Sequence, residues 1–153
     1  MLEESRELAI DEALVALKTP PHSVEAEQSV LGGLMLDNEA WDKVGNVITA
    51  DYFYNPAHRK LYACIQSLAQ DMKPFDPITV AEELDRRDEL HETGGVLYLT
   101  ELVESIPSIA NIESYAAIIH ERAIRRRLIS VSQQIADSAY RPEGRTVNDL
   151  VEN

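Results

Sequence analysis

The side chains that most often bind metals or act as nucleophiles are few in this 153-residue sequence, and they lie far apart. The four histidines are His22, His58, His91 and His120, and the one cysteine is Cys64. His91-Glu92 begins like the zinc-binding motif H-E-x-x-H, but Gly95 stands where the second histidine is required. Isolated histidines of this kind are more often structural or solvent-facing groups than metal ligands. Apolar neighbours likewise favour Cys64 as a packed thiol over a nucleophile.

A run of acidic residues offers another candidate for catalysis. It consists of Glu82, Glu83, Asp85, Asp88 and Glu89. Carboxylates three or four residues apart share one face of a helix and could together hold Mg²⁺. Arg86 and Arg87 interrupt the run, which favours a solvated, charged helix face over a metal site. A small helical enzyme that uses this cluster and a metal stays open as an alternative.

The glycines do not indicate a site for nucleotide phosphates. A nucleotide-hydrolysing loop requires G-x-x-x-x-G-K-[ST], and none of the six glycines precedes a lysine. The dinucleotide pattern G-x-G-x-x-G does not occur either. Four arginines, Arg122, Arg125, Arg126 and Arg127, could contact a phosphate backbone. Because the rest of the chain would repel nucleic acid, a salt-bridged or interface helix face is favoured. A weak nucleic-acid-binding module that uses Arg122–Arg127 is kept as an alternative.

The net charge of −13 is unevenly distributed along the chain. Residues 1–121 hold 23 acidic and 8 basic residues, a balance of −15, whereas residues 122–153 hold 4 and 6, a balance of +2. Broad contact with nucleic acid needs an excess of Lys and Arg, so little direct DNA binding is expected. An acidic body with a basic end indicates self-association or a basic protein partner.

Composition places the chain among soluble globular domains. Hydrophobic residues make up 44% and charged residues 27%, which excludes wholesale disorder and collagen. A single cysteine cannot pair within the chain, so no oxidising compartment is indicated. No apolar stretch approaches the ~20 residues that span a bilayer, and the acidic start is unlike a signal peptide. A cytoplasmic protein without membrane contact is expected.

Apolar residues recur at helical spacing throughout, and strand-like alternation is never sustained, so the predicted fold class is all-α. Ser23 and Asp76 are expected to begin helices, and Gly94-Gly95 to interrupt the chain. Ile78 and Leu97 are expected on the apolar sides of their helices. The predicted helices cover about 1–18, 23–36, 39–48, 56 to the loop at 73, 76–90, 96–105, 111–140, and 146 onward.

The longest predicted helix has no Pro or Gly from Glu113 to Tyr140, which gives about 42 Å at 1.5 Å per residue. The body before it should be only about 30–35 Å across, so this helix is expected to overhang it. Four of its residues form an apolar row with the 4-3-4 spacing of a short coiled-coil seam. This apolar row consists of Ile124, Leu128, Val131 and Ile135. The sequence ends inside the next helix, which predicts a cut helical hairpin and a longer protein.

The chain is therefore expected to have three parts. Residues 1–19 form an acidic N-terminal arm, cut off by the break at Thr19-Pro20-Pro21. Residues 20–110 form the helical body. Residues 111–153 hold the long helix and the start of the second hairpin helix.

Several separated segments occur in an order that points to one family. The first, at 20–36, reads PPHSVEAEQSVLGGLML. It is followed by DYFY at 51–54 with PAH at 56–58, DPITV at 76–80, GGVLYL at 94–99 and IPSIANI at 106–112. Together with Tyr115-Ala116, these segments resemble the N-terminal domain of DnaB-type bacterial replicative DNA helicases. The resemblance covers residues 20–153 and leaves residues 1–19 outside.

The resemblance implies an all-α domain and a helical hairpin, followed in the full protein by a linker and a RecA-like ATPase domain that is absent here. ATP and Mg²⁺ are expected in that missing domain, with no cofactor, metal or catalytic residue in this one, which is not expected to be an enzyme by itself. The resemblance also implies dimers through the hairpins, a trimer of dimers in a hexameric collar, and binding of DnaG primase. Helicase loaders or inhibitor proteins are further partners that it suggests.

Two contact surfaces follow from this comparison. The apolar row is expected to be the oligomer interface. Primase is expected on the body, at Glu25, Glu92 and Tyr98. Glu25 should be exposed in a first helical turn, where it can pair with a cation, and Tyr98 is of a type enriched at interface hot spots. The alternative is that Tyr98 is buried core and Glu25 only complements the helix dipole.

Overall fold

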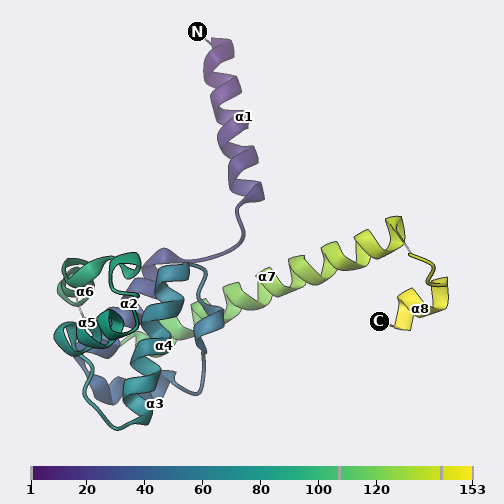
Figure 1. Ribbon diagram of the computed structural model, residues 1–153. Helices are drawn as coiled ribbons and strands as arrows, with labels where there is room; N and C mark the ends of the chain where they lie inside the picture. Colours follow the sequence, from purple (N-terminus) through teal and green to yellow (C-terminus); the bar gives the residue numbers. More distant parts are fainter. Residues whose placement is uncertain (1, 107, 142, 153) are drawn as a thin grey trace. The chain divides into compact units, whose positions relative to one another are not determined.

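The computed structural model of this chain consists of helices joined by short turns (Figure 1). It describes residues 2–106, 108–141 and 143–152, and within these ranges no residue belongs to a β-strand. The predicted all-α fold class is therefore confirmed. Over the same ranges, none of the helices is both long enough and apolar enough to cross a membrane. The backbone divides into two units, Met1–Pro21 with Arg125–Asn153, and His22–Ile124.

The unit His22–Ile124 is a bundle in which α2, α4, α5 and α6 pack in a closed cycle, each against the next (Figure 1). Short 3-10 turns (η) connect these helices, and the first half of α7 completes the unit. The elements are α2 (Val24–Leu36), η1 (Asn38–Ala40), α3 (Trp41–Val44), η2 (Ala50–Tyr52), α4 (Pro56–Gln70), α5 (Pro77–Arg86), η3 (His91–Thr93), α6 (Gly95–Glu104) and α7 (Ile112–Tyr140).

Side-chain caps fix where three of these helices begin. Ser23 accepts a hydrogen bond from the backbone N–H of Ala26 at 3.2 Å, and Asn55 caps α4 in a similar way. The Asp76 carboxylate accepts hydrogen bonds from the N–H groups of Ile78 and Thr79 at the start of α5, and Thr79 Oγ1 accepts one from the N–H of Asp76, which completes a capping box. A cap of this kind stabilises a helix by about 1 kcal/mol. The helix starts predicted at Ser23 and Asp76 are confirmed.

Close approach of α2 and α6 depends on Gly32. A Cβ atom at this position would lie 2.3 Å from the backbone oxygen of Leu102, which no real side chain allows. The core around this contact is formed by large apolar side chains and by one histidine. The largest fully buried side chains are Tyr62, Phe53, Leu31, Leu34, Ile48, Leu61, Ile65, Leu84, Leu99, Ile119, His58 and Val30.

Two helices end earlier than the sequence suggests. The helix predicted over 39–48 is η1 followed by α3, which ends at Val44. The helix predicted to reach residue 90 ends at Arg86, because Asp88 adopts a left-handed backbone with φ of 57°. The predictions of these two ends were wrong.

Two side chains expected on apolar faces are exposed instead. Ile78 is 69% exposed and Leu97 is 72% exposed. Each lies two residues before a buried side chain, Val80 and Leu99, and two residues turn an α-helix by about 200°. Both therefore face away from the core, and the prediction of an inward-facing Ile78 was wrong.

The other unit contains α1 (Leu2–Lys18), the second half of α7 and α8 (Val147–Glu152). α7 is one continuous helix of 29 residues. The N–H of Thr146 donates to the Asp149 carboxylate at 3.0 Å, and the N–H of Asp149 donates to Thr146 Oγ1 at 3.2 Å, which confirms the predicted capping box of α8. The overhang of α7 and an arm formed by residues 1–19 stay predictions.

Candidate functional site

The residues predicted to contact primase lie on α2, η3 and α6. Glu25 is exposed in the first turn of α2. Glu92 of η3 pairs with Lys60 of α4, and both side chains are partly exposed. Tyr98 is half-buried on α6, with its hydroxyl oxygen 2.6 Å from Nε2 of His58. Tyr98 is therefore partly accessible, while its hydroxyl contacts a buried side chain.

Tyr98 ends a polar network that joins three helices. Nδ1 of His58 lies 2.8 Å from Oε1 of Glu27, and Nε2 of the same ring lies against the Tyr98 hydroxyl. Gln28 donates a hydrogen bond to that hydroxyl at 3.3 Å. His58 is 0% exposed and Glu27 is 2% exposed. Because α2 supplies Glu27 and Gln28, α4 supplies His58 and α6 supplies Tyr98, the network fixes these helices relative to one another.

Glu27 also holds the segment that precedes α4. The N–H groups of Tyr54 and Asn55 donate to its carboxylate at 2.8 Å and 3.3 Å. Burial by itself raises the pKa of Glu27, but hydrogen bonds from His58 and from these two N–H groups outweigh it, so the pKa lies below its ordinary value. Glu27 is therefore ionised at neutral pH and can only accept hydrogen bonds.

Glu27 and His58 were not among the site residues predicted from the sequence, although their positions within their helices indicate burial. Glu27 stands four residues before Leu31 and His58 four residues before Tyr62, so each occupies a position in the apolar row of its helix. A carboxylate and an imidazole at such positions require buried partners. The sequence alone does not say which partners, because the three helices meet only in the folded bundle.

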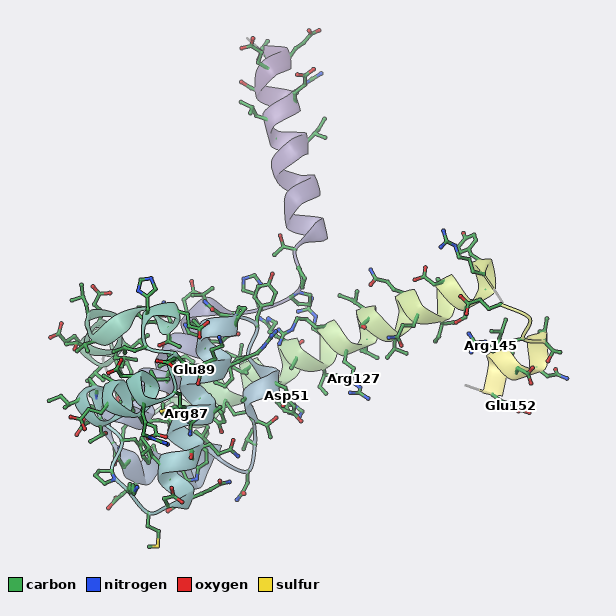
Figure 2. All side chains as sticks on the ribbon, viewed as in Figure 1. Asp51, Arg87, Glu89, Arg127, Arg145 and Glu152 are labelled. Atoms are coloured by element: carbon green, nitrogen blue, oxygen red, sulfur yellow. The ribbon has the colours of Figure 1, made fainter. Side chains whose placement is uncertain are left out.

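The acidic run of α5 is a surface of ion pairs. Glu83 binds both Arg86 and Arg87, and hydrogen bonds from Arg86 first and Arg87 second lower its pKa to about 2. Figure 2 labels Arg87 and Glu89 near the end of this helix. Among the described residues, no group of three or more His, Cys, Asp and Glu side chains is arranged to hold a metal ion. This geometry supports a charged helix face.

The apolar row on α7 is exposed along its whole length. Ile124 is 42% exposed, Leu128 62%, Val131 41% and Ile135 62%. Val131 and Ile135 also line a groove of about 590 Å³ on the side of α7 that faces α8, together with Val147, Leu150 and Val151. Contiguous exposed apolar side chains are typical of surfaces that contact another protein, so the row stays a predicted interface.

The arginines beside the apolar row contact protein groups in part. Arg122 pairs with Glu121, and Arg126 donates a hydrogen bond to the backbone oxygen of Pro21 at 2.8 Å. Arg127 is exposed, and Figure 2 labels it on α7. At least two of the four arginines thus have partners within the chain, as expected for a salt-bridged helix face.

Cys64, His22 and His120 pack against other residues of the unit His22–Ile124. Cys64 is a buried free thiol, and burial raises its pKa to about 11, which confirms the prediction of a packed thiol. His22 stacks on Tyr54 with ring centroids 4.2 Å apart. His120 lies against Tyr52 at 5.4 Å.

The fold and these surfaces define a class of protein, an all-helical domain with a long helix that exposes an apolar face. A sequence model of the family described as "DnaB-like helicase N terminal domain" matches residues 19–121. The chain belongs to this family, which confirms the resemblance found in its sequence.

Relatives of the chain support its membership of this family. The chain is 44% identical over 133 residues to the replicative DNA helicase DnaB of Pasteurella multocida, a match that covers 87% of the chain and 28% of that helicase. It is 41% identical over 134 residues to the replicative DNA helicase DnaC of Bacillus subtilis, covering 88% of the chain and 29% of that helicase. The chain thus spans less than a third of the length of either relative.

Solved structures show the same fold. The N-terminal domain of DnaB helicase from Mycobacterium tuberculosis superimposes with a TM-score of 0.84 at 39% identity, covering 88% of this chain and 94% of that one. A DnaB-like replicative helicase, described with its interactions with primase, superimposes with a TM-score of 0.66 at 28% identity. That match covers 83% of this chain and 30% of the helicase.

Proposed function

We propose that this chain is the collar and protein-docking domain of a hexameric replicative DNA helicase, where it supports ring assembly and recruits primase. The observation that carries the proposal is the exposed apolar row of α7, in a chain of the DnaB-like N-terminal family. Exposed apolar side chains at coiled-coil spacing are stabilised when a second helix covers them. In the collar, the hairpin of a neighbouring subunit would do so, giving dimers and a trimer of dimers.

The body is the proposed docking surface for primase. A DnaB-like helicase that shares this fold is described with its interactions with primase, which supports such a partner here. The first turn of α6 exposes Val96 and Leu97, beside the half-buried Tyr98. Glu25 and Glu92 add exposed carboxylates on α2 and η3. An apolar centre with a charged rim is the usual anatomy of a protein interface.

Catalysis is assigned to the part of the helicase that lies outside this chain. ATP and Mg²⁺ would act in the RecA-like domain, and the acidic collar would neither hydrolyse ATP nor compete for DNA. The alternative of a metal-dependent enzyme loses support because Glu83, one of the five residues of the acidic run, is bound by two arginines. The proposed setting is the bacterial cytoplasm at the replication fork, where loaders or inhibitor proteins would be further partners.

Titration of the chain with the C-terminal region of primase tests the docking half of the proposal. Glu25→Lys and Tyr98→Ala should each weaken binding by about 1–3 kcal/mol if central to the interface, and by less at its rim. Glu82→Lys, which makes the same charge change at an exposed site of α5, should bind like the wild type.

Circular dichroism should show that all three variants stay folded. Full-strength binding by folded Glu25→Lys and Tyr98→Ala would place the docking site elsewhere on the body. Failure of the wild-type chain to bind the primase region would contradict recruitment of primase altogether.

A further inference from the structure

When the His58 ring is neutral, the polar network of Glu27, His58, Tyr98 and Gln28 has one consistent arrangement of protons. The ionised Glu27 carboxylate can only accept, so His58 Nδ1 must donate to it. In a neutral imidazole the other nitrogen then accepts, and the Tyr98 hydroxyl must donate to Nε2. The hydroxyl oxygen in turn accepts from the Gln28 amide. The three hydrogen bonds therefore form one chain. Gln28 donates to Tyr98, Tyr98 donates to His58, and His58 donates to Glu27.

We infer that His58 is a positioning residue, which Glu27 holds as the Nδ1–H tautomer and which fixes the Tyr98 ring in one orientation on the docking surface. The docking step rests on the proposed function, whereas the tautomer and the ring orientation do not. His58 itself is fully buried and would touch no partner. Its effect on binding would pass through the Tyr98 hydroxyl.

The Tyr98 ring is held from a second side by the backbone. A Cβ atom built on Gly94 would lie 2.7 Å from Cβ and 2.8 Å from Cγ of Tyr98, so the glycine leaves room for the side chain to pack closely. The hydroxyl is fixed by His58 and Gln28 at the opposite end. A ring fixed at both ends loses little conformational freedom on binding, which favours affinity.

Stability alone is a poor explanation for this network. Replacing a buried pair of polar or charged groups by apolar residues of similar volume is often neutral or stabilising. A fully satisfied polar network instead specifies one geometry. Here the described buried side chains leave no nitrogen or oxygen atom without a hydrogen-bond partner. The network is therefore complete, as a positioning device requires.

Nitrogen NMR of the histidine rings in the wild-type chain tests the tautomer. At neutral pH, His58 should give a protonated-type resonance for Nδ1 and an unprotonated, hydrogen-bonded resonance for Nε2, with assignment by loss of the signals in His58→Gln. Tyr98→Phe, which keeps the ring and removes the hydroxyl, should shift the Nε2 resonance and leave His91 unchanged. An Nε2–H tautomer, an average of the two tautomers, or a ring protonated at both nitrogens would overturn the inference.

Binding of the C-terminal region of primase tests the positioning role. His58→Gln and Tyr98→Phe should each weaken binding several-fold, and the double variant should be no weaker than the weaker single variant, because both remove one interaction. His120→Gln is the matched control and should bind like the wild type. The positioning role would be overturned if the folded single variants bound with wild-type affinity. It would also be overturned if the folded double variant lost affinity by the product of the two single losses. If the wild type fails to bind, the proposed function and the docking step fall together, while NMR still decides the tautomer.

Discussion

At the scale of single residues, Glu27 is a carboxylate almost without access to water whose pKa is nevertheless lowered. A group whose pKa is lower in the folded than in the unfolded chain stabilises the fold above its unfolded pKa, about 4.3 for Glu. That contribution is lost as pH falls through the folded pKa. Glu27→Gln should therefore lower the free energy of unfolding at pH 7 by about 1–3 kcal/mol, with the difference from wild type narrowing below about pH 4.

Urea unfolding followed by circular dichroism at pH 7 and at about pH 3 measures the free energy of unfolding on both sides of this transition. Glu82→Gln is the control, because it removes an exposed carboxylate and should change stability by less than about 0.5 kcal/mol. If Glu27→Gln were equally mild at pH 7, or if its effect were the same at both pH values, the ionised carboxylate would not stabilise the fold.

The same residues show how far the sequence could predict the site. Glu25 is exposed in a first helical turn, and a sequence pattern is sufficient to place it there. Tyr98 could be assigned to the surface or to the core, and the structure places it between the two. The network of Glu27, His58 and Tyr98 was not predicted. Glu27 and His58 are 31 residues apart in the sequence, and His58 and Tyr98 are 40 residues apart, so only tertiary packing brings them together.

At the scale of elements, the turn from η3 into α6 contains two glycines with positive φ, 100° at Gly94 and 74° at Gly95. Alanine in this left-handed region costs about 1–2 kcal/mol at either position. At Gly94 the added Cβ would also overlap the Tyr98 side chain, whereas nothing lies within 4 Å of the Cβ position at Gly95. Gly94→Ala should therefore destabilise the chain by about 2–4 kcal/mol in total, and Gly95→Ala by only about 1–2 kcal/mol.

Thermal and urea unfolding of the two variants measure this difference, with each serving as the control for the other. Equal destabilisation would mean that the Tyr98 ring shifts without cost and is not clamped against Gly94. A larger loss in Gly95→Ala would contradict the described turn.

Helix starts were predictable because a cap is local, whereas helix ends and exposed faces were not. Ser23 and Asp76 need only neighbours two or three residues away to form their hydrogen bonds. Ile78 is as apolar as the buried Val80, and its exposure follows from the side of α5 that packs against α4 and α6. Which side of α5 is buried is decided by the packing of the whole bundle.

At the scale of the whole molecule, the acidic charge and the apolar row of α7 point to assembly. A net charge of −13 keeps separate chains apart, so association must rely on a specific apolar contact. The apolar row is the proposed contact, and Leu128 is its most exposed member together with Ile135, at 62% each. Burial of these side chains against a second chain would remove apolar surface from water, at about 25 cal/mol per Å².

Leu128→Asp should therefore weaken self-association at least about tenfold, equivalent to ~1.4 kcal/mol, because a desolvated carboxylate would replace an apolar side chain. Sedimentation equilibrium of the chain measures the dimer fraction, and circular dichroism should show unchanged helical content. Gln133→Asp, at an exposed polar position on another face of α7, adds the same charge and should leave the dimer fraction unchanged. Unfolding of the body by Leu128→Asp would instead make Leu128 part of the core. A wild-type chain that stays monomeric at the highest measurable concentration, or equal loss of dimer in both variants, would contradict association through the apolar row.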